Sequence, residues 1–250
     1  MPLIQSVERA LLLIDLFDEY NTELKLQEIS NLLGLNKSTV HSLLMTLQKH
    51  RYIEQNKDNK RYRLGLKLFE RGNYVIHNIS LREAVREYLL SLSWETNHTS
   101  HLVILDNNQG LYVDKVEGKS VTVARSRIGR RLPIHSSGAG KVLMAYKKQE
   151  ELKKILHNYD YKKETNNTIT NEAKYLQELE KVKRNGFAID NEENEPGICC
   201  LAVPIKDYTF EVIAAVSLSI PSLELKEEAK KVIPMLKRVG YSISLDLGGG

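Results

Sequence analysis

The sequence predicts an α+β protein with an N-terminal winged helix-turn-helix and a larger C-terminal domain in which helices and strands are segregated. Three observations support this prediction. Two short helical patterns are joined by a turn at Gly34. A basic hairpin pattern follows them directly, at residues 51–64. From about residue 80 onward, short strand patterns separated by turns are typical of an antiparallel meander flanked by helices.

The bulk composition sets limits on the class of protein. A chain of 250 residues is long enough for two domains and a sizeable core. The apolar run at 10–14 is too short for a signal peptide, and no stretch approaches the length of a membrane span, so we expect a cytoplasmic protein. Cys199 and Cys200 are adjacent and are the only cysteines, which excludes a disulfide framework or a zinc set. We expect no metal and no cofactor.

The first two helices are predicted from apolar spacing. The pattern indicates a helix over 9–20, whose inward-facing residues are expected to be Ala10, Leu11, Ile14 and Leu16 or Phe17. LQEISNLL at 26–33 is a short amphipathic helix that ends at Gly34, a residue suited to the left-handed C-terminal position. Asn36 stands where the N-cap of the next helix belongs.

The third helix, within LGLNKSTVHSLLMTL at 33–47, has two contrasting faces. One face is an apolar stripe made of Val40, Leu43, Leu44 and Leu47. The opposite face carries Ser38, Ser42, Met45 and Lys49, with His41 at its edge. Short hydroxyls with one His and one Lys suit contact with phosphates and base edges, whereas a helix that only needs solubility is rich in Glu and Lys. Taken alone, this face is also compatible with a solvated surface.

The segment after the third helix favours DNA binding. Two extended runs, 51–55 and 61–64, surround the turn-forming residues 56–59, as in the wing of a winged helix-turn-helix. Residues 1–36 hold two basic and six acidic side chains, whereas residues 37–63 hold seven basic and two acidic ones. This local change of sign is the charge pattern expected opposite a phosphate backbone.

We therefore predict which residues contact double-stranded DNA. The side chains expected in the major groove are Lys37, Ser38, Thr39, His41 and Ser42. Arg61 and Arg63 on the wing are expected to hold phosphate or to reach the minor groove.

The rest of the chain alternates between helical and extended patterns. Helices are predicted over 66–79, 81–95, 137–146, 150–157, 171–184 and 224–245. Strands are predicted over 101–106, 110–117, 121–127, 187–193, 200–205 and 211–220. The corresponding domains are a DNA-binding domain at 1–65, a linker helix at 66–80 and a C-terminal domain at 81–250.

The motif SSGAGK at 136–141 invites comparison with a phosphate-binding P-loop. It does not match, because His135 and Val142 stand where that motif requires Gly and Ser or Thr. Free N–H groups at a glycine-rich helix entry can hold a carboxylate, although a turn that only caps the helix is equally compatible. Ser217 and Ser219 point to one face of a strand, where Asp190 or neighbouring backbone groups are possible partners.

Six motifs in order carry a resemblance to a known family. They are SVERALLLIDLF, LQEISNLLGLNKSTVHSLLMTL, RYRLGLKLFE, GRRLPIHSSGAGKVLMA, NGFAIDNEENEPGICCLAVPI and AAVSLSIP. From end to end the chain resembles the IclR family of bacterial transcriptional regulators. The resemblance implies a GAF-like effector-binding domain after the linker helix, and dimers or tetramers on palindromic operators. It also implies control by small organic acids or aromatics.

The resemblance also implies a set of ligand-binding residues. They are Gly138, Ala139, Asp190, Ile198, Cys200, Ser217 and Ser219. Cys199 departs from the family pattern, since relatives commonly have Arg at this position, so the ligand of a relative cannot be transferred directly. Asp190 favours a ligand that carries hydroxyl or amine donors as well as a carboxylate, because an ionised Asp repels a bare carboxylate.

Two further classes of function are compatible with single residues of the chain. His135, Asp190 and Cys200 could form a thiol hydrolase, or Cys200 could act as a redox sensor. A cysteine without a basic neighbour in the sequence is more typical of a small buried apolar residue. We therefore predict no catalytic residues. The expected function is that of a metabolite-controlled transcriptional regulator. The prediction is a repressor, and activation of transcription is the alternative.

The oligomeric state follows from the geometry of DNA. One reading helix covers only a few base pairs, and symmetric proteins place two such helices about 34 Å apart. The helices at 9–20 and 66–79 offer Leu, Ile and Phe side chains to a partner. We predict at least a dimer, with a tetramer implied by the resemblance.

Overall fold

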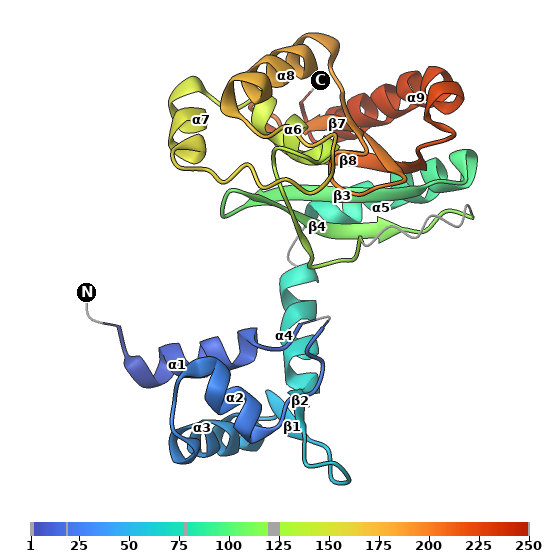
Figure 1. Ribbon diagram of the computed structural model, residues 1–250. Helices are drawn as coiled ribbons and strands as arrows, with labels where there is room; N and C mark the ends of the chain where they lie inside the picture. Colours follow the sequence, from blue (N-terminus) through green and yellow to red (C-terminus); the bar gives the residue numbers. More distant parts are fainter. Residues whose placement is uncertain (1–2, 19, 78–79, 120–125, 250) are drawn as a thin grey trace. The chain divides into compact units, whose positions relative to one another are not determined.

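The computed structural model describes residues 3–18, 20–77, 80–119 and 126–249 (Figure 1). The chain divides into two compact units, Met1–Ile79 and Ser80–Gly250. No described helix is long and apolar enough to cross a membrane.

The first unit is a winged helix-turn-helix. Its elements are α1 (Gln5–Asp15), α2 (Leu26–Leu33), α3 (Lys37–Lys49), the antiparallel hairpin of β1 (Ile53–Gln55) and β2 (Tyr62–Leu64), and α4 (Leu66–His77). The core is formed by Leu13, Phe17, Leu24, Ile29, Val40, Leu44, Ile53 and Tyr62.

The turn between α2 and α3 forms as the sequence predicts. Gly34 adopts a left-handed conformation with φ of 64°, which a residue with a side chain adopts only under strain. The side chain of Asn36 accepts a hydrogen bond from the backbone N–H of Thr39 at 2.9 Å and so caps α3. Val40 and Leu44 of the apolar stripe are fully buried.

The prediction for the first helix was wrong in its bounds and, at Leu11, in its buried face, whereas Phe17 is buried as predicted. The helix begins at Gln5, four residues earlier than expected, and ends at Asp15. Asp18 explains the early end, because its carboxylate accepts the backbone N–H groups of Tyr20 and Asn21 and so stabilises a turn there. Leu13 is buried, whereas Leu11 is 58% exposed. Five consecutive apolar residues do not reveal which of them faces the core.

The second unit contains a six-stranded antiparallel sheet of order β5-β4-β3-β8-β7-β6. Its strands are β3 (Thr99–Asp106), β4 (Gln109–Val116), β5 (Arg131–Leu132), β6 (Ala188–Asn191), β7 (Ile198–Lys206) and β8 (Val212–Pro221). The strand predicted over 121–127 falls mostly outside the described residues. The short strand β5 was not predicted, because two residues are too few to show a pattern.

Helices cover both faces of this sheet (Figure 1). The helices are α5 (Ser80–Thr96), α6 (Gly138–Ala145), α7 (Gln149–Leu156), α8 (Glu172–Asn185) and α9 (Leu225–Asp246). On the α5 side, Ser100 donates its hydroxyl to the carbonyl of Leu89. On the α6 side, Gly138 lies directly against the backbone of Cys200. The expected α+β class is confirmed, and every helix predicted in this unit forms within one or two residues of its expected bounds.

A β-bulge changes the facing of β4 at a functionally important point. The pairing register between β3 and β4 shifts between Leu102 and Val103. Tyr112 therefore faces the α6 side, although Asp114, two residues on, faces α5 and pairs with Arg86 at 2.7 Å. Without the bulge, residues two apart would share one face of the sheet.

Candidate functional site

The polar face of α3 is exposed along the first two turns of the helix. Lys37, Ser38, His41 and Ser42 are all exposed, and Thr39 is half-buried. The hydroxyl of Ser42 donates to the carbonyl of Ser38 at 3.0 Å, so it stays close to the helix surface. Such a face can enter a groove and offer hydroxyl, imidazole and ammonium groups to a duplex.

The two arginines of the wing have different surroundings. The guanidinium of Arg61 donates to the backbone carbonyl of Glu23 at 3.0 Å and to the carboxylate of Glu28 at 3.2 Å. It thus fastens the wing to the start of α2. Arg63 is more exposed, at 52% of its side chain against 32% for Arg61, and pairs with Glu54 at 3.3 Å. This placement favours a structural role for Arg61 and leaves Arg63 nearer to solvent.

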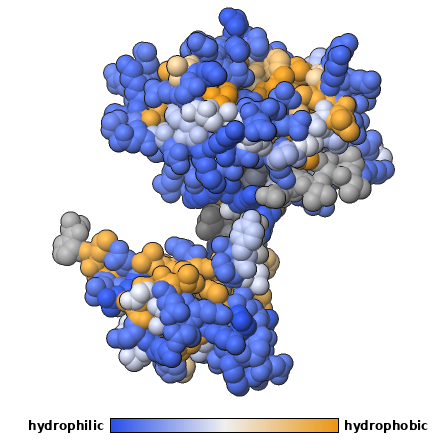
Figure 2. All heavy atoms as spheres, in the orientation of Figure 1, coloured by the Kyte–Doolittle hydropathy of each residue, from blue (hydrophilic) through white to orange (hydrophobic). Residues whose placement is uncertain are grey.

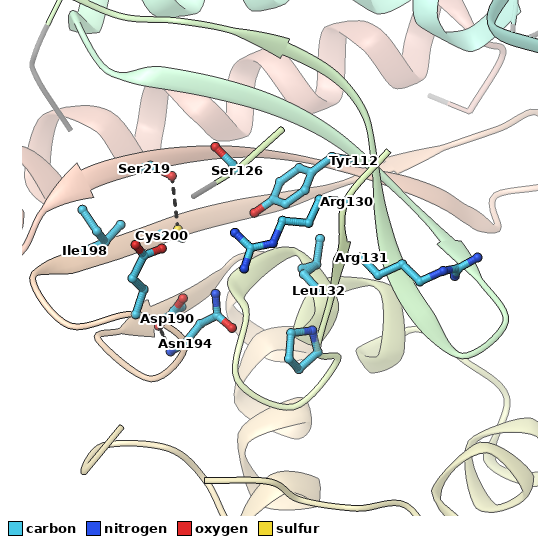
Figure 3. A pocket seen from close by; sticks show the side chains of 12 residues that line it. Tyr112, Ser126, Arg130, Arg131, Leu132, Asp190, Asn194, Ile198, Cys200 and Ser219 are labelled. Atoms are coloured by element: carbon cyan, nitrogen blue, oxygen red, sulfur yellow. Dashed lines mark hydrogen bonds between the residues drawn. The ribbon is translucent and has the colours of Figure 1, made fainter. Parts of the chain in front are cut away.

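The second unit holds a partly enclosed cavity on the α6 side of the sheet (Figure 3). It is lined by Tyr112, Ser126, Arg130, Arg131, Leu132, Pro133, Asp190, Asn194, Glu195, Ile198, Cys200 and Ser219. The centre of a water molecule can occupy about 50 Å³ of this space. Since one water needs roughly 10–15 Å³ by this measure, the cavity suits a few water-sized groups, as in a small organic molecule.

The charged side chains of the cavity point in different directions. Arg130 reaches across the cavity towards the side that carries Asp190 and Asn194 (Figure 3). Arg131 extends away from the centre and pairs with Asp106. The hydroxyl of Ser219 lies 3.4 Å from the Cys200 sulfur, on neighbouring strands of the wall. A guanidinium, the carboxyl groups of Asp190 and Glu195, and hydroxyls thus surround one small space.

Asp190 is the most perturbed acid of the cavity wall. Its side chain is 2% exposed, and one carboxylate oxygen accepts the backbone N–H groups of Glu193 at 2.7 Å and Asn194 at 3.3 Å. Burial raises the pKa of Asp190 from 3.8 to about 7, against the opposing effect of these hydrogen bonds. The carboxyl group is therefore partly protonated near neutral pH.

Four of the seven expected ligand-binding residues come together in this cavity. Asp190, Ile198, Cys200 and Ser219 line it. The other three are buried beside it. Gly138 packs against the Cys200 carbonyl, Ala139 is a buried core residue of α6, and Ser217 pairs with Ala202 on β7. The N-cap hydroxyl of Ser137 accepts the N–H of Gly140 at 3.2 Å, so that N–H already has a partner.

Sequence reasoning missed several cavity residues, above all Tyr112, Ser126, Arg130 and Asn194. Arg130 and Asn194 stand in the motifs GRRLPIHSSGAGKVLMA and NGFAIDNEENEPGICCLAVPI, which could have indicated them. Tyr112 and Ser126 stand outside the six motifs and carry no such signal.

His135, Asp190 and Cys200 do not form the catalytic arrangement that a thiol hydrolase would need. The ring of His135 is held by the Tyr159 hydroxyl at 2.9 Å and the Lys162 carbonyl at 3.0 Å. Burial raises the pKa of the Cys200 thiol, which opposes formation of the reactive thiolate. Among the described residues, no group of His, Cys, Asp and Glu side chains is arranged to hold a metal ion.

Comparison with known proteins agrees with this architecture. Residues 6–57 match the IclR helix-turn-helix domain, and residues 73–245 match the bacterial transcriptional regulator IclR C-terminal domain. The chain is 46% identical over 249 residues to the HTH-type transcriptional regulator XynR of Escherichia coli strain K12, covering 99% of both chains.

Solved structures share the fold. The crystal structure of the Thermotoga maritima IclR matches with a TM-score of 0.80 and 32% identity, covering 98% of this chain and 100% of that one. An IclR homolog from Microbacterium hydrocarbonoxydans, crystallised as a complex with 4-hydroxybenzoate, has a TM-score of 0.85 at 22% identity, covering 98% and 100% of the two chains. The winged helix-turn-helix, the family domains and these relatives together establish that the chain belongs to the IclR family of DNA-binding transcriptional regulators and is not an enzyme.

Proposed function

We propose that this regulator is a repressor whose operator binding is controlled by a small organic acid held in the cavity of the second unit. The observation that carries the proposal is the partly enclosed, mostly polar cavity in which Arg130 faces Asp190 and Asn194. A guanidinium is the side chain best suited to a carboxylate. Asp190, Ser219 and the Tyr112 hydroxyl suit hydroxyl groups of the same ligand.

The ligand class follows from this mixture of groups. An acid with one or more hydroxyls offers a carboxylate to the guanidinium and hydroxyl donors to the acceptors of the wall. An apolar acid offers no such donors, and a buried polar group that loses its partner costs about 1–3 kcal/mol. The complex of a family relative with 4-hydroxybenzoate, which has one carboxylate and one hydroxyl, supports an acid of this kind. For control, the acid must bind the DNA-competent and incompetent states with different affinity.

A thermal-shift screen tests the cavity. Among lactate, glycerate, gluconate and 4-hydroxybenzoate, at least one hydroxylated acid should raise the melting temperature, because binding to the folded state stabilises it. Ser219→Ala removes one hydroxyl from the cavity wall and should weaken the shift, whereas Ser91→Ala, on the exposed face of α5, should not. An acid that stabilises Ser219→Ala and Arg130→Gln proteins as well as wild type would contradict the assignment.

For DNA, we propose that Lys37, Ser38, Thr39, His41 and Ser42 contact the major groove of a palindromic operator. The exposed start of α3 supports this role. His41 and Ser42 then influence which base pairs are preferred, while Lys37 contributes mainly to overall affinity.

The wing arginines give a prediction about salt dependence. Because Arg61 is engaged with Glu23 and Glu28, we expect Arg63→Ala to lower the slope of log affinity against log salt by about one, the loss of one phosphate contact. Arg61→Ala should change this slope less and should instead loosen the wing. DNA-binding titrations of both variants at several salt concentrations show which of the two arginines contacts a phosphate. A lower slope in Arg61→Ala alone would instead assign the phosphate contact of the wing to Arg61.

We propose a homodimer as the smallest DNA-binding form, and a tetramer as an association of two such dimers. The support is a row of exposed apolar side chains on and before α1, visible in the lower part of Figure 2. It consists of Leu3, Ile4, Val7, Leu11 and Leu12, between 49% and 76% exposed. Light scattering at micromolar concentration should give the mass of at least two chains, and Val7→Glu should lower it.

A further inference from the structure

We propose that Lys141 is a positioning residue of the effector cavity, whose buried ammonium group holds the turn after β6, so that Asn194 and Glu195 line the cavity beside Asp190. This inference rests on the proposed function only in taking this cavity as the effector site. Lys141 is the last residue of the SSGAGK motif and has no role in the functions considered above.

The contacts of Lys141 are those of a buried anchor. Its side chain on α6 is fully buried, with 0% exposed. The ammonium donates to a Glu193 carboxylate oxygen at 2.6 Å and to the Ile189 carbonyl at 2.8 Å, with Glu178 at 3.7 Å. Burying an ammonium group costs several kcal/mol before pairing, and an apolar side chain of similar length would fill the space without that cost. The positive charge of Lys141 is therefore best explained by the groups that it binds, the Glu193 carboxylate and the Ile189 carbonyl.

Lys141 and Asp190 both form hydrogen bonds with Glu193, one with its side chain and the other with its backbone. Lys141 binds the side chain of Glu193, while the Asp190 carboxylate accepts the Glu193 backbone N–H at 2.7 Å. The Thr168 hydroxyl adds a third contact, donating to the Glu193 carbonyl at 2.6 Å. Glu193 itself is only 7% exposed and stands in the middle of the turn. Asn194 and Glu195, which line the cavity, follow it directly.

The charges around Asp190 make this role measurable. Lys141 from α6 favours the ionised form of Asp190, whereas Glu193 from the same turn opposes it. Cys200 of β7 and Tyr112 of β4 also face Asp190, and Arg130 and Glu195 stand at the cavity. Removing the ammonium group therefore removes a cation that favours the carboxylate, and raises the pKa of Asp190.

The test compares Lys141→Met with Lys181→Met in the full-length protein. Lys181 is a matched control because it is exposed and also pairs with Glu178, at 3.2 Å. The side-chain carboxyl carbon of Asp190 is titrated by NMR, with its resonance assigned by its loss in Asp190→Asn. We expect the titration midpoint to rise by at least half a pH unit in Lys141→Met and to stay unchanged in Lys181→Met. Amide hydrogen exchange at Glu193 and Asn194 should become at least tenfold faster in Lys141→Met alone.

A second variant covers the case in which Lys141→Met does not fold. Lys141→Met/Glu193→Leu removes both charges of the pair, a change that is often neutral for stability. This double variant should fold and should show faster amide hydrogen exchange at Asn194. The ligand is whichever of lactate, glycerate, gluconate and 4-hydroxybenzoate stabilises wild type. The double variant should bind that acid at least tenfold more weakly than wild type does. The proposal would be overturned if Lys141→Met kept both the wild-type titration midpoint of Asp190 and the wild-type amide exchange. It would also be overturned if the double variant kept wild-type amide exchange and wild-type affinity for the acid. If none of these acids binds wild type but the midpoint and the exchange still change, the effector assignment fails while the anchoring of the turn by Lys141 is supported.

Discussion

Replacing Ser42 by glutamate is expected to lower operator affinity at least a hundredfold while leaving the fold intact. Ser42 is exposed on the face of α3 that we assign to the major groove, so a carboxylate there meets base edges and phosphates. Loss of a base contact costs about 1–3 kcal/mol, and repulsion between two charges near a protein surface adds to it. Together these effects exceed the 2.7 kcal/mol or so that correspond to a factor of one hundred. Glutamate is a good helix former, so α3 should persist.

The measurement is fluorescence anisotropy with an operator selected from random DNA by the wild-type protein. Gln149→Glu provides the control, because it adds the same charge at an exposed position in the second unit. It should bind within twofold of wild type at equal salt. If Ser42→Glu also bound within threefold of wild type, α3 would not be the reading helix.

The second large effect concerns pH. Affinity for a carboxylate-bearing effector should fall as pH rises through about 7, because the protonated form of Asp190 becomes an ionised neighbour that repels the ligand. If binding requires the protonated form, each pH unit above the midpoint costs about tenfold in affinity. Calorimetric titration between about pH 5.5 and 8.5 with the acid found in the thermal-shift screen measures this dependence. In Asp190→Asn the dependence should disappear, and an unchanged slope in that variant would contradict the role of Asp190.

The same group should influence stability with a defined sign. The pKa of Asp190 is raised from 3.8 in the unfolded chain to about 7 in the folded one, so the folded state binds more protons between these values. Its contribution to the free energy of unfolding is fully present below pH 3.8 and is lost as pH rises to about 7, by up to roughly 4 kcal/mol. His101 acts in the opposite sense, because burial lowers its pKa from 6.5 to about 3. Denaturation of wild type and Asp190→Asn at several pH values therefore isolates the contribution of Asp190 to the free energy of unfolding by difference.

The helix-turn-helix could be predicted from sequence because its signals are local. Gly34 ends α2 through its own backbone conformation, and Asn36 caps α3 through a residue only three positions away. The change of charge at residue 37 is likewise a property of the chain itself. The buried face of α1 was less predictable, because a run of apolar residues indicates burial without specifying which residue is buried.

The cavity was predicted only in part, and the reason is its dependence on sheet register. Asp190, Cys200 and Ser219 could be placed through the motifs of the family resemblance, whereas Tyr112 reaches the cavity only because a bulge reverses the facing of β4. No local pattern reports that bulge. The segment carrying Ser126 and Arg130 contributes through its position in space, since it has no regular spacing of its own.

By itself, the sequence determined the class of protein, the caps and apolar stripe of the reading helix, and the change of charge beside it. Each of these depends on residues within a few positions of one another. Only the tertiary structure decided that Arg61 is bound to Glu28, that Gly138 packs on β7 rather than lining the cavity, and that Lys141 anchors Glu193. These contacts join residues 33 to 62 positions apart in the chain. These contacts form because α2 packs on the wing and α6 packs on the sheet. No spacing of residues along the chain predicts that packing.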